Sequence, residues 1–270
     1  GFYVLTPDIP GLRHFQIDPA TADHVSFWLA QFQSLDEARG IRRIGLAGVS
    51  FSGTMALMAA ALPENRRAAA FVLAIGAYSD LPRCAEGWFA AGPETVGQGR
   101  YPTRYYGRWV MMLDALDLIE EEAGRAFLRR ALTDLLLEKD HLDEPPQDFG
   151  ETALRWYRLA AGRESVPDPE LARQIIGHLV SRLGSRLSPD AAAASVECPV
   201  FLAHGLYDDL IPSSESARLG GKIRRARHYL LVSPFVTHTH PAAEEITFGA
   251  KVRAASEMFV FLYRLVSLAG

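Results

Sequence analysis

The chain has 270 residues, of which 49% are hydrophobic and 22% are charged, and its formal net charge is −4. This composition is typical of a globular protein and excludes disorder along most of the length. The slightly negative charge argues against a surface that binds nucleic acid. The length fits one large domain, or a core domain that carries an insertion.

The sequence has no segment expected to span a membrane. Its longest apolar run, residues 68–78, is about half of the roughly 20 residues that a transmembrane helix needs. The N-terminus shows no signal-peptide pattern, and Cys84 and Cys198 lack a metal-binding or redox spacing. We therefore expect a cytoplasmic protein, and because the chain begins at Gly1 rather than Met, we expect the natural protein to extend upstream. The oligomeric state is not determined by the sequence.

The first part of the chain predicts strands that alternate with helices. Apolar runs at residues 2–5, 44–47 and 71–75 predict strands, and the spacing of apolar residues predicts helices over 23–35 and 54–62. Strands that are apolar on both faces and alternate with helices indicate a parallel sheet covered on both sides. We therefore expect an α/β fold with a mostly parallel sheet.

The middle of the chain, residues 82–196, contains no convincing strand. Helices are predicted there over residues 109–118, 123–137, 152–161 and 169–183. The loops between them are rich in proline, glycine and charge. We interpret this segment as a helical insertion.

Strand patterns return near the C-terminus. Residues 199–203 and 229–232 predict strands, and a final helix is predicted over 241–268. These elements join the first strands in one predicted core domain, made of residues 1–81 and 197–270.

The most informative segment is 44–57, which predicts a strand, a tight turn with Ser50, and a helix. A serine at such a turn is exposed above the carboxyl edge of a sheet. Its neighbours must be small because the strand and helix backbones pass close together, and the pattern here is Gly48-x-Ser50-x-Ser52. The N–H of Phe51, at the helix N-terminus, is the expected first oxyanion donor. Taken alone, the segment also fits a strand–helix turn that contains a serine by chance.

A second segment, residues 199–212, ends an apolar strand in His204-Gly205 and continues into a loop with two acids. An acid in such a loop can orient an imidazole and stabilise its protonated form. Asp208 is the first candidate and Asp209 the alternative. A solvated or helix-capping aspartate would fit the same pattern.

A third segment places two histidines in the loop after the last predicted strand, from which one can reach back over the sheet edge. His238 is favoured because it lies three residues before Pro241, and His240 is the alternative. Either also fits a surface or helix-capping histidine. The His238-x-His240 spacing suits zinc, but no third ligand has a matching spacing. We therefore expect no metal and no cofactor.

The order of serine, acid and histidine, each after a predicted strand, resembles the α/β-hydrolase family. The nucleophile elbow of that family is similar to residues 48–53, its acid loop to residues 204–212, and its final histidine turn to residues 238–241. Residues 4–11 are similar to a Pro-Asp-x-Pro-Gly turn of the family.

The resemblance implies a serine hydrolase that cleaves an ester or thioester of a small acyl substrate. In this interpretation Ser50 is the nucleophile, His238 the general base, and Asp208 the acid that orients it. The Phe51 N–H would bind the oxyanion.

The resemblance covers residues 1–81 and 197–270, and it implies that the helical insertion between them, residues 82–196, is a lid. It implies three further strands before residues 2–5, and a loop among them that supplies the second oxyanion donor. We therefore expect that donor upstream of Gly1.

Two other kinds of function fit the same motifs. One is different chemistry on this scaffold, such as acyl transfer, because a fold does not determine a reaction. The other is a catalytically inactive module used for binding.

Overall fold

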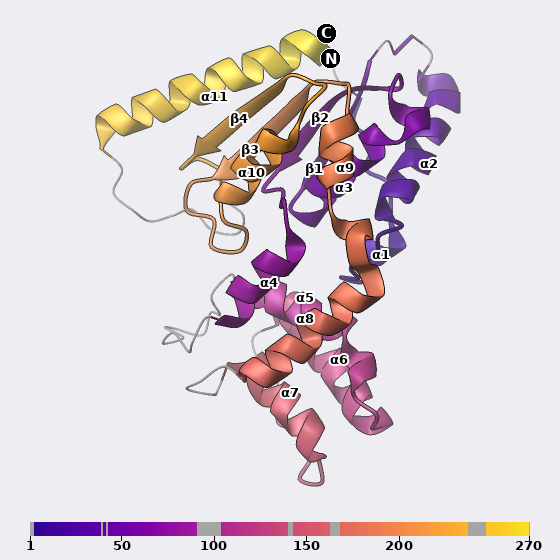
Figure 1. Ribbon diagram of the computed structural model, residues 1–270, viewed down its shortest axis with the longest axis vertical. Helices are drawn as coiled ribbons and strands as arrows, with labels where there is room; N and C mark the ends of the chain where they lie inside the picture. Colours follow the sequence, from indigo (N-terminus) through magenta and orange to yellow (C-terminus); the bar gives the residue numbers. More distant parts are fainter. Residues whose placement is uncertain are drawn as a thin grey trace. The chain divides into compact units, whose positions relative to one another are not determined.

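The computed structural model describes residues 3–38, 40–41, 43–90, 104–139, 143–162, 168–236 and 247–269. The chain forms two compact units (Figure 1). Unit 1 contains residues 1–9, 19–80 and 188–270, and unit 2 contains residues 10–18 and 81–187. Unit 2 therefore also takes a segment from outside the predicted insertion, and residues 188–196 lie in unit 1.

Unit 1 contains one sheet of four parallel strands in the order β1-β2-β3-β4. The strands are β1 (Ile44–Val49), β2 (Ala69–Ile75), β3 (Val200–Gly205) and β4 (His228–Ser233). The predicted parallel α/β architecture is therefore confirmed. Parallel strands end at one edge of the sheet, so the segments that follow β1, β3 and β4 leave from the same edge.

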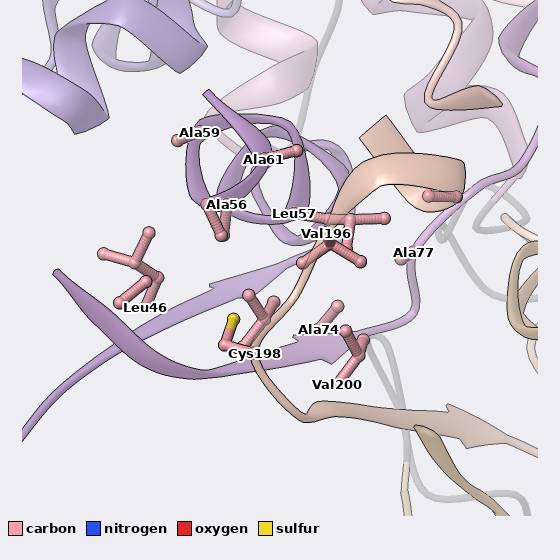
Figure 2. Close-up of a cluster of buried hydrophobic side chains, with 14 of the residues drawn as sticks. Leu46, Ala56, Leu57, Ala59, Ala61, Ala74, Ala77, Val196, Cys198 and Val200 are labelled. Atoms are coloured by element: carbon pink, nitrogen blue, oxygen red, sulfur yellow. The ribbon is translucent and has the colours of Figure 1, made fainter. Parts of the chain in front are cut away.

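One face of the sheet is covered by α3 (Phe51–Ala61), α9 (Asp190–Ser195) and α10 (Ser214–Lys222), and α2 (Thr21–Ser34) packs on α3. Figure 2 shows the buried cluster on this face, in which Leu46, Ala74 and Val200 from the strands lie with Ala56 and Leu57 from α3. The two faces of each strand bury different residues because side chains alternate along it.

The opposite face is covered by α11 (Phe248–Ala269) (Figure 1). Phe201 is fully buried here, stacked on Tyr229 and in edge contact with Phe261 of α11. Every residue of β3 is buried, as expected for a strand with neighbours on both sides and helices on both faces.

The regular secondary structure of unit 2, in the part that the structure describes, is helical. Its α-helices are α1 (Pro10–Arg13), α4 (Leu81–Ala90), α5 (Arg104–Asp114), α6 (Glu122–Leu136), α7 (Glu151–Ala161) and α8 (Pro169–Leu183). Arg108 is 2% exposed and donates hydrogen bonds to the carbonyls of Trp88 in α4 and Leu159 in α7. This one side chain therefore joins three helices by binding carbonyls near the C-terminal ends of two of them.

Short 3₁₀ helices complete the described elements. They span Asp36–Ala38, Pro63–Asn65, Leu116–Leu118 and Gly184–Leu187. Leu116–Leu118 lies inside the helix predicted over 109–118, so that prediction was wrong about its boundaries: α5 begins earlier and ends at Asp114.

The strand predicted over residues 2–5 is also wrong for the part that is described, because residues 3–5 have no regular secondary structure. Tyr3 is 78% exposed and Val4 is 87% exposed. A strand needs a neighbour to satisfy its N–H and C=O groups, and the β1–β4 sheet contains no fifth strand among the described residues. Among those residues, too, no helix is long and apolar enough to cross a membrane.

Candidate active site

Ser50 lies in the tight turn between β1 and α3. Its backbone has φ 58° and ψ −130°, a conformation that side-chain-bearing residues rarely adopt. The Ser50 N–H donates to the carbonyl of Ile75 at 2.7 Å, and the Ser50 carbonyl accepts from Gly53 N–H at 3.0 Å. The turn is thus fastened to the end of β2 on one side and to the first turn of α3 on the other.

The small residues around Ser50 are required by the close approach of the two backbones. A Cβ on Gly48 would lie 2.3 Å from the carbonyl oxygen of Ser52, and a Cβ on Gly53 would lie 3.0 Å from the carbonyl oxygen of Gly48. The Ser52 hydroxyl donates to the Val49 carbonyl at 2.7 Å and lies 3.0 Å from the Val49 N–H. Ser52 therefore fits the position where the family motif more commonly has glycine.

The first turn of α3 is also bound to the loop after β2. The Thr54 hydroxyl lies 3.0 Å from the carbonyl oxygen and 3.1 Å from the N–H of Tyr78, and both residues are fully buried. Phe51 stacks on Tyr78 with ring centroids 6.1 Å apart. These contacts fix the Phe51 backbone at the N-terminus of α3, where helix N–H groups favour negative charge.

Asp208 lies in the turn just after β3, and its side chain is 2% exposed. Its Oδ1 accepts hydrogen bonds from the N–H groups of Leu210 at 3.0 Å and Ile211 at 2.9 Å. Its Oδ2 lies 3.3 Å from Nε2 of His204. Asp209, the alternative acid, is exposed to solvent, so the geometry favours Asp208 as the held carboxylate.

His238 and His240 lie outside the described residues. The described chain after β4 ends at Val236, whose carbonyl oxygen would be 2.6 Å from a Cβ on Gly205. The same Cβ would lie 3.5 Å from the Cβ of Asp208. The segment that leads to both histidines therefore passes directly against the acid loop, and only glycine fits at position 205.

His204 is the residue whose importance the sequence analysis missed. It is fully buried, between Asp208 and Ser216 of α10. The sequence signal was a histidine inside an otherwise apolar strand, one residue before Gly205.

These features together form a recognisable arrangement: a parallel sheet, a strained serine between β1 and α3, and a held acid after β3 in the strand order β1-β2-β3-β4. Unit 1 has an α/β fold built on a parallel sheet. Ser50 in the turn between β1 and α3, and Asp208 after β3, are two of the positions on which the resemblance to the α/β-hydrolase family rests.

Comparisons with other proteins gave structural similarity only. No protein-family model matches the chain, and no curated protein matches its sequence. Among solved structures, acetyl xylan esterase 1 from Thermoanaerobacterium is similar, with 15% identity and a TM-score of 0.39. The similarity covers 97% of this chain but 60% of the esterase, so the chain spans less than two thirds of that protein.

Two further structures match at a comparable level. An alpha/beta fold family hydrolase from Bacillus anthracis has 14% identity and a TM-score of 0.39, over 90% of this chain and 75% of the other. The meta-cleavage product hydrolase from Pseudomonas fluorescens has 18% identity and a TM-score of 0.37, over 91% and 72%. Scores this low establish no shared fold, and the α/β architecture described here rests on the geometry of unit 1.

The described residues contain no group of three or more histidine, cysteine, aspartate or glutamate side chains placed to hold a metal ion. The His238-x-His240 pair lies outside them.

Proposed function

We propose that this protein is a serine hydrolase that cleaves an ester or thioester through Ser50, His238 and Asp208. The observation that carries the proposal is the backbone of Ser50, held at φ 58° by hydrogen bonds on both sides of the turn. Such strain costs about 1–3 kcal/mol, and residues that retain it cluster at active sites.

The path of the chain after β4 supports His238 as the base. Val236 lies against Gly205, at the start of the acid loop, and His238 follows Val236 by two residues. Two residues span at most about 7 Å of chain, so the sequence allows His238 to reach Asp208.

The proposed reaction has two stages. The Ser50 hydroxyl attacks the acyl carbon while His238 takes its proton, and the Phe51 N–H stabilises the negative charge on the carbonyl oxygen. His238 then gives that proton to the leaving alcohol or thiol, and Asp208 stabilises the histidine while it is protonated. Water, deprotonated by His238, attacks the acyl carbon, the bond from that carbon to the Ser50 oxygen breaks, and His238 returns the proton to Ser50 as the acid is released.

The test is covalent labelling with a fluorophosphonate, followed by peptide mapping. We expect an adduct on Ser50 that is absent in Ser50→Ala. The matched control is Ser34→Ala, because the Ser34 hydroxyl is exposed and bonds only within its own helix turn; this variant should label like the wild type. Failure of the folded chain to label at Ser50 would contradict the proposal and favour a binding module.

Paired substitutions test the other two proposed catalytic residues, His238 and Asp208. We expect His238→Ala and Asp208→Asn to slow labelling by about 10²-fold or more, and His240→Ala and Asp209→Asn to leave the rate within about twofold. The reverse pattern in either pair would assign the role to the alternative residue. Product analysis with a 4-nitrophenyl ester in the presence of an added alcohol separates hydrolysis from acyl transfer.

A further inference from the structure

A buried histidine lies directly behind the proposed catalytic acid. His204, near the end of β3, is 0% exposed. Its Nε2 lies 2.7 Å from the carbonyl oxygen of Ile211 and 3.3 Å from Oδ2 of Asp208. Both neighbours are acceptors, so Nε2 carries the proton and donates to them. The imidazole therefore contacts both the Asp208 carboxylate and the Ile211 carbonyl. Ile211 in turn donates its N–H to Oδ1 of Asp208.

The other nitrogen of the ring connects His204 to α10 and, through α10, to the loop after β2. Nδ1 lies 2.6 Å from the hydroxyl of Ser216, the third residue of α10. That hydroxyl lies 3.2 Å from the carbonyl oxygen of Ala77, in the loop after β2. His204, Ser216 and Ala77 are all fully buried.

The same loop reaches the nucleophile elbow. Tyr78, the next residue after Ala77, is bound through its backbone to the Thr54 hydroxyl, one turn of α3 after Ser50. An unbroken series of buried polar contacts thus runs from Asp208 through His204 and Ser216 to the helix that begins at the serine. Removing one partner of a hydrogen bond in such a dry environment leaves the other partner unsatisfied, at a cost of about 1–3 kcal/mol. These contacts therefore hold the groups that they join in one arrangement.

We propose that His204 is a positioning residue, which sets the place of the Asp208 carboxylate and ties the acid loop to the nucleophile elbow. This inference rests on the proposed function, because Asp208 must be the catalytic acid for its position to matter. His204 does not act on the substrate; it acts through Asp208. A displacement of the acid by about 1 Å would misalign the base and lower the rate by about 10²-fold.

The experiment compares two substitutions by 4-nitrophenyl ester hydrolysis and by the rate of fluorophosphonate labelling. His204→Phe keeps a ring in the buried space and removes the polar contacts of both ring nitrogens, with Ser216, Ile211 and Asp208. We expect kcat to fall about 10²-fold with KM changed less than about threefold. His204→Gln keeps an N–H donor near the position of Nε2, and we expect its kcat to lie within about tenfold of the wild type. The matched control is His24→Phe in α2, which removes a histidine whose Nδ1 has no hydrogen-bond partner and which should keep the wild-type rate.

A double-mutant comparison separates positioning from general damage to the fold. In an Asp208→Asn background, His204→Phe should lower the rate by less than about twofold, because the group that it positions is already disabled. If the two losses multiply instead, His204 is a structural residue and the proposal is wrong.

The outcomes also separate this inference from the proposed function. A wild-type chain that does not label at Ser50 overturns the serine hydrolase mechanism, and the positioning role with it. A wild-type chain that labels, together with a folded His204→Phe that labels equally fast, overturns the positioning role alone. If His204→Phe does not fold, Ser216→Ala decides, because it removes the hydroxyl that contacts His204 Nδ1. A fall in kcat without a change in KM supports the proposal, and wild-type kcat overturns it.

Discussion

At the scale of single residues, the candidate site contains several positions at which the backbone geometry restricts the residue type. Gly48 and Gly53 permit the contact of β1 with α3, and Gly205 permits the contact of the acid loop with Val236. Ser50 differs from these, because its side chain is unfavourable for the backbone conformation that it adopts. A residue kept where glycine would be less strained indicates a function for its side chain.

This strain gives a prediction about stability. We expect Ser50→Gly to raise the free energy of unfolding relative to Ser50→Ala by about 1 kcal/mol, because glycine adopts φ 58° without a Cβ clash whereas alanine does not. Urea denaturation followed by circular dichroism measures the difference. Both variants lack the hydroxyl, so both should also lose fluorophosphonate labelling. Equal or lower stability of the glycine variant would show that the turn is not strained.

At the scale of secondary-structure elements, the clearest local device is the N-terminus of α8. The Asp168 carboxylate accepts a hydrogen bond from Leu171 N–H at 3.0 Å, and Pro169 occupies the first helical position. Arg155 of α7 donates to Asp168 Oδ2 at 3.0 and 2.6 Å. Burial alone would raise the pKa of Asp168, but the hydrogen bonds from Leu171 and Arg155 outweigh it and lower the pKa.

Substitution of Asp168 separates these two contributions. Asp168→Asn keeps a capping oxygen and loses the ion pair, so we expect a loss of about 0.2–1 kcal/mol; Asp168→Ala should lose about 1 kcal/mol more. The measurement is the free energy of unfolding from urea denaturation. If the two variants are equally stable, the cap contributes nothing.

The same residue predicts a dependence on pH. A carboxylate whose pKa is lowered in the folded state stabilises the fold above its ordinary pKa of 3.8, and this contribution is lost as the pH falls through and below that value. The stability difference between the wild type and Asp168→Asn should therefore shrink as the pH is lowered from 6 towards 3. A difference that is constant over this range would contradict the assignment of the lowered pKa to the folded state.

At the scale of the whole molecule, each unit has its own apolar interior. In unit 1 the two faces of the sheet bury different side chains, with Val72 and Leu202 beneath α3 and α10 and with Phe201 beneath α11. Cys198 lies in the first of these clusters, just before β3 (Figure 2). Burial raises the pKa of its thiol from 9.0 to about 11, although its own backbone partly offsets the effect.

Cys198 therefore reports on unfolding of this core. The thiolate is the reactive form, so in the folded protein at pH 8 we expect Cys198 to react with iodoacetamide far more slowly than a free cysteine. Reaction should follow the urea unfolding curve, and a Cys84→Ser variant isolates the signal because Cys84 is the other cysteine of the chain. Rapid modification under native conditions would contradict the burial of Cys198.

Much of the α/β core could be predicted from the amino-acid pattern. The strands β1 to β4 are short apolar runs between turn residues, and α8 begins and ends where the pattern predicts it, at Pro169 and Leu183. The exception near the N-terminus, residues 3–5, shows why such a pattern is incomplete. An apolar run becomes a strand only if another strand lies beside it, and that condition depends on the rest of the fold.

The sequence by itself determined the kind of site: a serine at a strand–helix turn between small residues, and an acid after a later strand. Those features are local, because turn geometry and close backbone approach select residue types within a few positions. The sequence ranked Asp208 ahead of Asp209, and the tertiary structure showed that Asp208 is the buried, hydrogen-bonded carboxylate of the two and that His204 lies beside it. Burial and hydrogen-bond partners come from segments distant in sequence, here α10 and the loop after β2, so no local pattern around β3 could supply them.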